Sequence, residues 1–343
     1  MSYLVGETKL QQWAGGKVYS LSKNIKVKFN GNRLSMPIYS SRRRLNSVLG
    51  EVNPDIVHVM VPYSPLMAQR VIAAAHRRGT AIIGSFHILP AGWLSSVGNY
   101  LLGLIQFVSL KKIDEFSATS QNAGQFAAKT MRIKSSVVPN MVDVAAFSAG
   151  RQVNKVPGQI VFLGRLVGRK GCAQLIKAFA LVAKNNPDVR LVIAGDGPDR
   201  QKLERLAKKL GQEDKIKFLG FISEADKPKI LGRAQITCFP ALYGESFGLV
   251  LVEAMAAGGG VIIAGDNPGY RCVMGERPLQ LVRAKDATKL ADTINLFLAD
   301  KEKAREALNW QMAEAGKYDV NVVGKQLLGL YDQAIAKHSE SGA

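Results

Sequence analysis

Two glutamates flank the start of an apolar, helix-forming segment in the second half of the chain. Glu245 and Glu253 lie eight residues apart within residues 243–258, and Ser246 between them is a favourable N-cap residue. A helix that begins at Ser246 would separate the two carboxylates by about 12 Å, close to the length of a nucleotide sugar. Carboxylates accept hydrogen bonds from hydroxyls, so the pair indicates a binding site for an elongated, sugar-bearing ligand. A capped core helix with one surface acid and one buried acid fits the pattern equally well.

The start of the same segment has the properties of an anion site. Helix N-termini carry backbone amides without intrahelical acceptors, and the helix dipole is positive there. In this sequence those amides would belong to Phe247, Gly248 and Leu249. The segment therefore predicts that a phosphate or another anionic group binds at this helix end.

A basic turn follows the apolar run at residues 160–164. Arg165 stands at the carboxyl end of this predicted strand, and Lys170 stands at the start of the next helix. A guanidinium offers a planar fork to phosphate oxygens and an ammonium offers a compact charge, so the two residues can reach one diphosphate. Basic residues are common in strand-to-helix turns, but convergence with the predicted anion site favours this interpretation. Gly195, after the next strand, makes a tight turn or leaves room for a ligand.

The composition is that of a globular protein with two domains. The chain has 343 residues, of which 47% are apolar and 21% are charged. Its three cysteines, Cys172, Cys238 and Cys272, are too few and too scattered for a disulfide framework or a metal site. We therefore expect no disulfides and a cytoplasmic location. The first residues lack the basic start, long apolar stretch and cleavage site of a signal peptide.

Positive charge is concentrated in the first part of the chain. The net charge is +19, and residues 1–150 contain 17 Lys and Arg against 6 Asp and Glu. Such a surface attracts phosphates, whether of nucleic acid, anionic lipid or substrate. Aromatic residues make up only 7% of the chain and no nucleic-acid-binding module is recognisable, so we expect no nucleic acid partner. An anionic membrane surface remains a candidate partner for the basic N-terminal domain.

Residues 88–110 form a long uncharged stretch. Its 23 positions meet the length criterion for a bilayer span, but glycine, proline and polar residues dilute its apolarity. Large apolar residues recur at helical spacing, which predicts a one-sided helix that ends at Lys111 and Lys112. This helix either packs in the core of the first domain or dips into a lipid surface. The recurring residues are Trp93, Leu94, Val97, Leu101, Leu104, Ile105 and Val108.

Strand and helix patterns alternate along most of the chain, which predicts parallel sheets covered by helices on both faces. The polar stretch of residues 150–158 predicts a linker. We expect an N-terminal domain over residues 1–150, completed by a C-terminal helix over 320–338, and a second doubly wound domain over 151–319. The expected strands span residues 55–61, 80–87, 115–119 and 136–138, then 160–164, 190–195, 216–221, 236–240 and 260–264.

Several of these segments resemble, in order, the motif set of the retaining family 4 glycosyltransferases. The motifs are Gly164-Arg165-Leu through Gly171, residues 192–199, residues 218–221 and Glu245 to Glu253, and the phosphatidyl-myo-inositol mannosyltransferase group has a similar pattern. The resemblance covers roughly residue 50 to the C-terminus. It implies the GT-B fold, in which two Rossmann-like α/β domains face each other across a cleft. It also implies transfer of a hexose from a nucleotide sugar, with mannose from GDP-mannose as the first choice. The alternative is a UDP-sugar-dependent transferase in cell-envelope polysaccharide synthesis. The basic first domain and the uncharged helix favour a lipid acceptor, either a membrane glycolipid or phosphatidylinositol.

The resemblance also implies roles for individual residues. The diphosphate would be held by Arg165 and Lys170, the donor sugar by Glu245 and the ribose by Glu253, while His87 would face the reacting centre from the acceptor side. On its own, His87 is as well explained as a packed residue at a strand end, and His58 is expected to be structural. The implied catalytic residues are His87 and Glu245, and the implied donor-binding residues are Arg165, Lys170, Phe247, Gly248, Leu249 and Glu253.

The sequence contains no Asp-x-Asp metal motif, so we expect no metal and no bound cofactor besides the nucleotide sugar substrate. Arg165, Lys170 and the helix end would offset the charge of the leaving diphosphate. The start of the chain departs from the family pattern, because its first strand and glycine-rich loop have no counterpart before the predicted strand at Tyr3 to Val5. A non-catalytic protein that only binds a nucleotide sugar is therefore an alternative. For the enzyme we expect a peripheral position at the inner face of the membrane.

Overall fold

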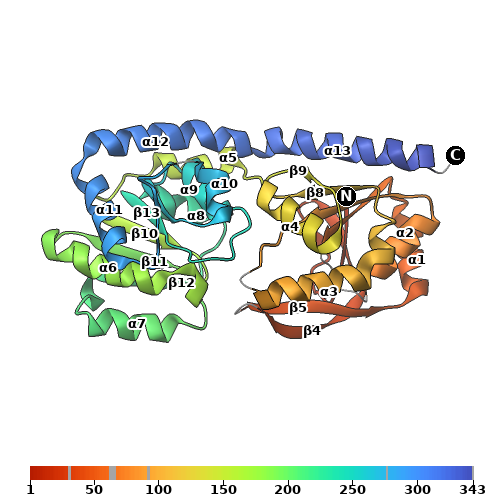
Figure 1. Ribbon diagram of the computed structural model, residues 1–343, viewed down its shortest axis with the longest axis horizontal. Helices are drawn as coiled ribbons and strands as arrows, with labels where there is room; N and C mark the ends of the chain where they lie inside the picture. Colours follow the sequence, from red (N-terminus) through yellow and green to blue (C-terminus); the bar gives the residue numbers. More distant parts are fainter. Residues whose placement is uncertain (30–31, 62–66, 91–92, 276, 342–343) are drawn as a thin grey trace. The chain divides into compact units, whose positions relative to one another are not determined.

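The computed structural model describes residues 1–29, 32–61, 67–90, 93–275 and 277–341 (Figure 1). These residues form two compact units. The first unit combines Met1–Val138 with Gln326–Ala343, and the second unit comprises Pro139–Lys325. Each unit has its own hydrophobic core and is described separately.

The second unit begins before the linker that the sequence predicts at residues 150–158. Val142 forms a parallel bridge with Asp319, and Gly150 packs so closely that a Cβ atom there would lie 2.4 Å from the Pro228 carbonyl oxygen. Arg151 donates a hydrogen bond from Nε to the Ala256 carbonyl at 3.0 Å. These contacts fasten the predicted linker region to the second unit. The predicted domain boundary at residue 150 stays a prediction, whereas the compact units divide at Val138.

The second unit is built on a six-stranded sheet in the order β12-β11-β10-β13-β14-β15, and every pairing in it is parallel. The five strands predicted here are present, each to within one residue at its ends, and the short strand β15 was not predicted. The parallel α/β architecture expected from the alternating pattern is therefore confirmed. The strands are β10 (Gln159–Leu163), β11 (Arg190–Ala194), β12 (Ile216–Gly220), β13 (Ile236–Phe239), β14 (Val261–Gly265) and β15 (Leu281–Val282).

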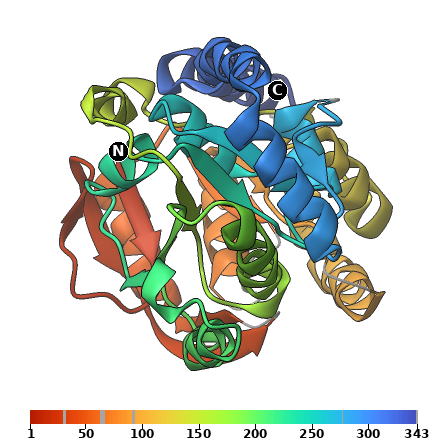
Figure 2. The same cartoon turned by 90° about the vertical axis from the view of Figure 1, so that its left-hand side faces the viewer.

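Helices cover both faces of this sheet, as Figure 2 shows in the view onto the second unit. Alternate residues of β10 enter two different cores: Ile160 and Phe162 pack with α6 and α11, while Val161 and Leu163 pack with α9. This alternation follows from the two-residue period of a strand and explains why β10 is apolar on every residue but one. The helices are α5 (Val144–Phe147), α6 (Cys172–Asn185), α7 (Arg200–Lys209), α8 (Lys227–Gly232), α9 (Leu249–Ala256), α10 (Pro268–Met274), α11 (Ala287–Ala299) and α12 (Lys301–Ala315).

The first unit contains a four-stranded parallel sheet in the order β6-β7-β8-β9, whose strands match the predicted ones to within one residue at their ends. The N-terminal region adds a three-stranded sheet, β1-β3-β2, and an antiparallel hairpin of β4 and β5. The hairpin was not predicted. The strands are β1 (Ser2–Val5), β2 (Gln12–Trp13), β3 (Gly16–Ser20), β4 (Ser22–Phe29), β5 (Asn32–Ser40), β6 (Ile56–Val61), β7 (Ala81–Phe86), β8 (Glu115–Ala118) and β9 (Ser136–Val137).

The C-terminal part of the last helix belongs to the first unit. Tyr331 donates or accepts a hydrogen bond with His58 Nδ1 at 2.7 Å, and Lys337 forms an ion pair with Glu115 at 2.9 Å. The helices of this unit are α1 (Arg42–Val52), α2 (Ala68–Arg77), α3 (Trp93–Leu110), α4 (Gln121–Met131) and the C-terminal part of α13 (Val320–Ser341).

Helix α3 turns small and polar residues inward and large apolar residues outward. Its buried face consists of Asn99, Gly103, Gln106 and Leu110, and a Cβ atom at Gly103 would lie 2.5 Å from the Thr130 carbonyl oxygen of α4. This close approach to α4 leaves no room for a large side chain on the inner face. The helix ends where the sequence predicts. The alternative in which its apolar residues pack in the core is wrong for those whose side chains are described. Val97, Leu101, Leu104, Ile105 and Val108 are all exposed, between 48% and 71%.

Trp93 and Leu94, which belong to the same predicted stripe, have side chains outside the described residues. Within the part of the chain that the structure describes, no helix combines the length and the apolarity that crossing a bilayer requires. The exposed side chains of α3 make its described part a surface helix with an outward apolar face.

His58 is a structural residue of the first unit. Its Nδ1 contacts the Tyr331 hydroxyl and its Nε2 contacts the Ser85 hydroxyl at 2.6 Å, and Ser85 in turn contacts the Ser117 hydroxyl. Burial, and to a lesser degree the nearby charge of His87, lowers the pKa of His58 to about 4. The imidazole is thus neutral at physiological pH, and it links β6, β7 and α13.

The depressed pKa predicts a pH-dependent stability of the first unit. Because the unfolded chain protonates His58 near pH 6.5 and the folded chain near pH 4, the unfolded state binds more protons between these values. The contribution of neutral His58, roughly 3 kcal/mol at most, is therefore complete above pH 6.5 and is lost as the pH falls towards 4. Urea unfolding at a series of pH values should show this slope in the natural chain and a smaller slope in His58→Gln. His76→Gln, at an exposed position of α2, is the control that should keep the slope.

Candidate functional site

The order of strands in the second unit reverses between β10 and β13. From β10 the chain adds β11 and β12 on one side of the sheet, and it then returns to add β13, β14 and β15 on the other side. The loops that follow β10 and β13 both begin at this point, and in sheets of this kind ligands bind at the carboxyl ends of the strands where the strand order reverses. Four of the predicted donor-binding residues lie in the two loops that flank this position, at residues 164–171 and 240–248: Arg165, Lys170, Phe247 and Gly248. The other two, Leu249 and Glu253, lie in the helix that follows the second loop.

An ion cluster joins these two loops. Arg169 Nη1 lies 2.6 Å from Glu245 Oε1, and Lys170 Nζ lies 2.9 Å from the same oxygen. All three side chains are largely buried, with exposed fractions of 11% to 18%. The Leu242 amide also donates to the Arg169 carbonyl at 2.8 Å. The structure therefore brings Lys170 and Glu245 together, as expected for two parts of one site, and adds Arg169, whose role the sequence did not reveal.

The cluster has more positive than negative charge. Glu245 is the carboxylate that pairs with Arg169 and Lys170, and Arg165, at the end of the same β10 loop, is exposed. Within the cluster two cations thus face one carboxylate, and the buried carboxylate fixes the positions of both cations.

Helix α9 begins later than the sequence predicts. Gly248 is its N-cap, with a φ angle of 111° that a residue with a side chain rarely adopts, and the helix runs from Leu249 to Ala256. The expectation that Ser246 caps the helix is therefore wrong, because the left-handed turn at Gly248 interrupts the backbone after Ser246. The estimate of 12 Å between Glu245 and Glu253 fails for the same reason, since Glu245 precedes the helix and the helical rise does not apply to it. The predicted amide group of Phe247, Gly248 and Leu249 spans this turn and the first helical residue.

Glu253 lies on the buried side of α9 and has a partner that the sequence did not suggest. Lys227 Nζ, at the start of α8, lies 2.9 Å from Glu253 Oε1 and 2.8 Å from Glu224 Oε2. Burial raises the pKa of Glu253, and the charge of Lys227 offsets part of this effect. Burial alone would lower the pKa of Lys227, but its bonds to the two glutamates raise it. Glu253 is thus a buried carboxylate in an ion pair, and its contact with a ribose stays a prediction.

The glycine turn after β11 serves packing. Gly195 has a φ angle of 132°, and a Cβ atom at this position would lie 2.0 Å from the Gly164 carbonyl oxygen. The missing side chain makes room for the neighbouring backbone, so the tight-turn interpretation of Gly195 holds and the space is not available to a ligand. At this turn, the loop after β11 packs directly against Gly164, at the start of the basic loop that contains Arg165.

The remaining predicted site residue, His87, belongs to the first unit. It directly follows β7 at the carboxyl end of the parallel sheet and is partly buried, near His58. The strand-end position expected for it is therefore present. Its part in any reaction stays a prediction.

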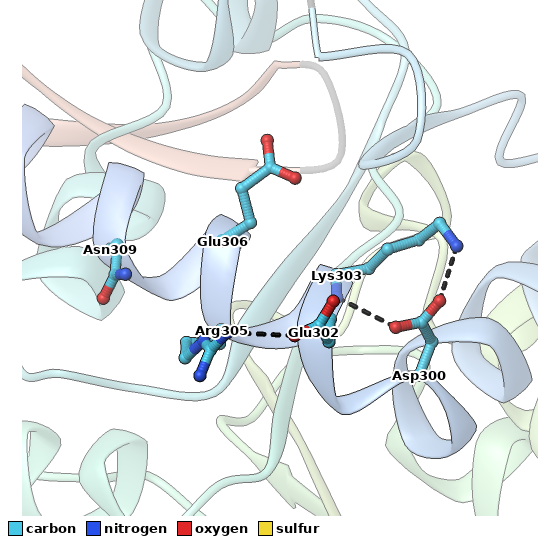
Figure 3. A pocket seen from close by; sticks show the side chains of 6 residues that line it. All are labelled: Asp300, Glu302, Lys303, Arg305, Glu306 and Asn309. Atoms are coloured by element: carbon cyan, nitrogen blue, oxygen red, sulfur yellow. Dashed lines mark hydrogen bonds and ion pairs between the residues drawn. The ribbon is translucent and has the colours of Figure 1, made fainter.

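A shallow hollow on α12 carries no comparable arrangement. Figure 3 shows its six side chains along the exposed surface of the helix, where Lys303 pairs with Asp300 and Arg305 pairs with Glu302. These are neighbours along one helix, and such pairs are common on solvated surfaces. Among the described residues, no group of three or more His, Cys, Asp or Glu side chains is arranged to hold a metal ion.

Comparison with known proteins identifies the family. The model of Glycosyltransferase Family 4 matches residues 17–146, and the model of Glycosyl transferases group 1 matches residues 145–313. The phosphatidyl-myo-inositol mannosyltransferase of Mycobacterium leprae is 31% identical over 335 residues, which cover 94% of this chain and 85% of the relative. The chain belongs to the family 4 glycosyltransferases. The enzyme of the same name from Mycolicibacterium smegmatis is 28% identical to this glycosyltransferase over 324 residues, or 92% of this chain and 81% of the relative.

Solved structures agree on the fold of this glycosyltransferase. Sucrose-phosphate synthase from Thermosynechococcus elongatus matches with a TM-score of 0.72 and 18% identity over 98% of this chain and 89% of that chain. Anabaena HepE, solved in complex with UDP, matches with a TM-score of 0.69 and 20% identity over 84% of this chain and 80% of that chain. The glycosyltransferase therefore has the GT-B fold, and the family recognised from the sequence motifs is confirmed.

The ion pairs of two residues in this glycosyltransferase could not be predicted from the sequence. Arg169 lies within the motif of residues 164–171, but its partner, the buried carboxylate of Glu245, is 76 positions away in the chain. Lys227 is the first residue of α8 and looks like an ordinary surface lysine. The signal that could have revealed Lys227 is Glu253 itself, because an acid within an otherwise apolar helix requires a buried cation.

The Glu253–Lys227 pair predicts a large stability effect. Lys227→Met would leave Glu253 buried without its main cation and should destabilise the second unit by about 3 kcal/mol. Adding Glu253→Gln should recover much of this loss, because the uncompensated charge is then gone. Urea unfolding of the two single variants and the double variant measures the coupling. Lys17→Met is the control, since the exposed Lys17–Glu51 pair should contribute little. A Lys227→Met chain as stable as the natural one would contradict the assignment.

Proposed function

We propose that this glycosyltransferase transfers a hexose from a nucleotide sugar to a lipid acceptor, with mannose from GDP-mannose as the first choice. The similarity to relatives named phosphatidyl-myo-inositol mannosyltransferase along nearly the whole chain supports this choice. The observation that carries it is the group of Arg165, Arg169 and Lys170 at the strand-order reversal of the second unit. A nucleoside diphosphate is an elongated dianion or trianion, and this is the part of the second unit with the charge and position to hold it.

In this proposal the cations act on the leaving group. The bond between the sugar C1 and the diphosphate oxygen breaks, and negative charge grows on the diphosphate as the bond lengthens. In the proposal Arg165 and Lys170 stabilise this charge, and the ion pair with Glu245 holds Lys170 in one position before the reaction. Glu245 holds Arg169 and Lys170 in place, and its Oε2, which accepts a hydrogen bond from Lys170, keeps a lone pair for a hydroxyl of the donor sugar.

The acceptor hydroxyl then forms the new bond to C1 on the face that the diphosphate leaves, which retains the configuration of the sugar. Its proton passes to the departing phosphate oxygen, so the step balances without a protein nucleophile. Neither Glu245 nor Glu253 needs to attack the sugar, which is consistent with their ion pairs to Lys170 and Lys227. In the proposal, His87 lies on the acceptor side and positions the hydroxyl, while Glu253 accepts hydrogen bonds from the ribose.

A lipid acceptor also fits the surface of the first unit. The apolar outer face of α3, defined by Val97, Leu101, Leu104, Ile105 and Val108, is flanked by basic residues, and Lys111 Nζ lies 4.3 Å from the centre of the Phe107 ring. Exposed apolar groups beside cations favour the interface of an anionic bilayer. We infer that the glycosyltransferase binds the membrane peripherally through this face, and that the face brings the enzyme to its acceptor.

The donor prediction is tested by a screen of nucleotide sugars with phosphatidylinositol vesicles as acceptor. GDP-mannose should give the fastest transfer, and UDP-sugars should give slower transfer. Faster transfer from a UDP-sugar would contradict the choice of GDP-mannose and identify that UDP-sugar as the donor. Saturable donor binding without hydrolysis or transfer would instead favour the non-catalytic alternative. The screen should be run on this chain and on a chain extended upstream.

The diphosphate site predicts a strong effect of single substitutions. Lys170→Ala and Arg165→Ala should each lower kcat/KM for sugar transfer by at least about 100-fold, because each removes a cation that stabilises the leaving group. The matched control is Lys177→Ala, an exposed lysine of the following helix α6, which should keep full activity. Circular dichroism and thermal unfolding check that the fold is intact. Near-full transfer by either site variant would exclude that residue from the site.

The membrane face makes a separate prediction. Replacing Leu104 and Val108 by serine should weaken binding to phosphatidylinositol-containing vesicles at low salt by at least about tenfold, since two exposed apolar side chains no longer enter the interface. Leu328→Ser, at an equally exposed apolar position of α13, is the control. Co-sedimentation with vesicles measures the effect. Equal binding of both variants, or no binding of the natural chain, would contradict the membrane assignment.

A further inference from the structure

The proposed function requires the charge of Lys170 in two places. Its ammonium is to stabilise the leaving diphosphate, yet Nζ lies 2.9 Å from Oε1 and 3.1 Å from Oε2 of Glu245. The Glu245 side chain is only 11% exposed, and a carboxylate at this depth is costly to leave without a cation. A diphosphate that draws Lys170 towards itself would create such a carboxylate, unless a second cation stays beside Glu245.

Arg169 is this second cation, and it is fastened to the loop that contains Glu245. Its Nη1 donates to Glu245 Oε1 at 2.6 Å and to the Gly244 carbonyl at 3.3 Å. Its own carbonyl accepts a hydrogen bond from the Leu242 amide at 2.8 Å. A guanidinium has five N–H donors in a rigid fork, so it can serve a carboxylate and a carbonyl at once. Arg169 is therefore held by both its side chain and its backbone.

The backbone around Lys170 is fixed, so its side chain is the part that can change partners. Lys170 is the last residue of the short turn Gly168–Lys170, and Gly171 follows with a φ angle of 73°. A Cβ atom at Gly171 would overlap the Pro240 carbonyl oxygen, which shows how closely the two loops pack. A lysine ammonium ends a flexible four-carbon chain, so it can reorient without any movement of this backbone.

We propose that Arg169 is a positioning residue, which keeps the Glu245 carboxylate paired while Lys170 turns its charge to the donor diphosphate; this role rests on the proposed function. Without Arg169, the diphosphate and Glu245 would compete for Lys170. With Arg169, two cations face one carboxylate, and one of them can pair with the donor. In the proposal Arg169 has no contact with the donor and acts through Glu245.

A cation near a phosphate site also attracts anions over a distance, without any part for Glu245. The two effects differ in how they depend on the carboxylate. Long-range attraction persists when residue 245 is neutral, whereas a cation that holds a carboxylate has no function once the carboxylate is gone. A double-mutant cycle of Arg169 and Glu245 therefore separates positioning from long-range attraction.

The cycle uses the full chain and measures the Kd of a nucleoside diphosphate, GDP or UDP, whichever binds more tightly, by titration calorimetry. These probes lack the donor sugar, so the proposed contact of Glu245 with that sugar does not enter the measurement. Arg169→Met should weaken binding at least about tenfold in the natural chain and less than about threefold in the Glu245→Gln chain. An equal loss in both chains, or no loss in the natural chain, would overturn the proposal.

Two further variants control for charge. Arg169→Lys keeps a cation and should bind the probe within about threefold of the natural chain, and a loss as large as that of Arg169→Met would contradict the need for a second cation. Lys177→Met removes one positive charge from the exposed surface of α6 and should keep the natural affinity. Thermal unfolding checks each fold, and Arg169→Gln, which keeps an amide donor for Glu245, takes the place of Arg169→Met if that variant misfolds.

Failure of this role and failure of the proposed function give different results. A natural chain that binds neither GDP nor UDP would overturn the proposed function and the role of Arg169 with it. A natural chain that binds the probe, together with an Arg169→Met chain of unchanged affinity, would overturn the role of Arg169 alone.

Discussion

The ion cluster of Arg169, Lys170 and Glu245 ties together the two loops on which the second unit depends. Parallel strands deliver their carboxyl ends to one edge of a sheet, but the loops that follow are separate segments of chain. Here a buried carboxylate from the loop after β13 holds two cations of the loop after β10. Because an unpaired charge is costly at this depth, the loops are stable together rather than singly. A charged site is thereby kept in a fixed geometry while one further cation, Arg165, stays exposed.

The second buried pair, Glu253 with Lys227, follows the same physical rule on the other side of α9. Helix α9 is almost wholly apolar and packs under the sheet, so a carboxylate within it is stable only beside a cation from α8. A polar ligand that approaches Glu253 would meet a carboxylate whose negative charge is already balanced by Lys227. The second unit thus contains two carboxylates whose charge is balanced by protein groups, which agrees better with binding of hydroxyls than with nucleophilic attack.

Much of the fold followed from the sequence because the parallel strands are short apolar runs between helices, a pattern that few other arrangements produce. The runs at 160–164 and 190–195 are examples. The antiparallel hairpin of β4 and β5 was missed, since its alternation is obscured by lysines and polar residues. The cap of α9 was also missed, because Ser246 satisfies the propensity rule while Gly248 adopts the conformation that starts the helix. In the candidate site, Lys170 and Glu245 belong to motifs that can be recognised in the sequence. Arg169 and Lys227 instead form their ion pairs with partners far away in the chain.

Helix α3 has a consequence for the behaviour of the purified protein. Its inner face consists of Asn99, Gly103 and Gln106, and Gly103 allows a close approach to α4. A rotation that buried the outer apolar residues would place large side chains against α4 and remove this close packing. In water without lipid or detergent, this face can be covered only by another molecule. Self-association under such conditions would then arise because no lipid or detergent covers this face. Adding detergent would raise the protein concentration at which the chains associate. We therefore expect any self-association of the chain through this face to depend on the amphiphile in the solvent.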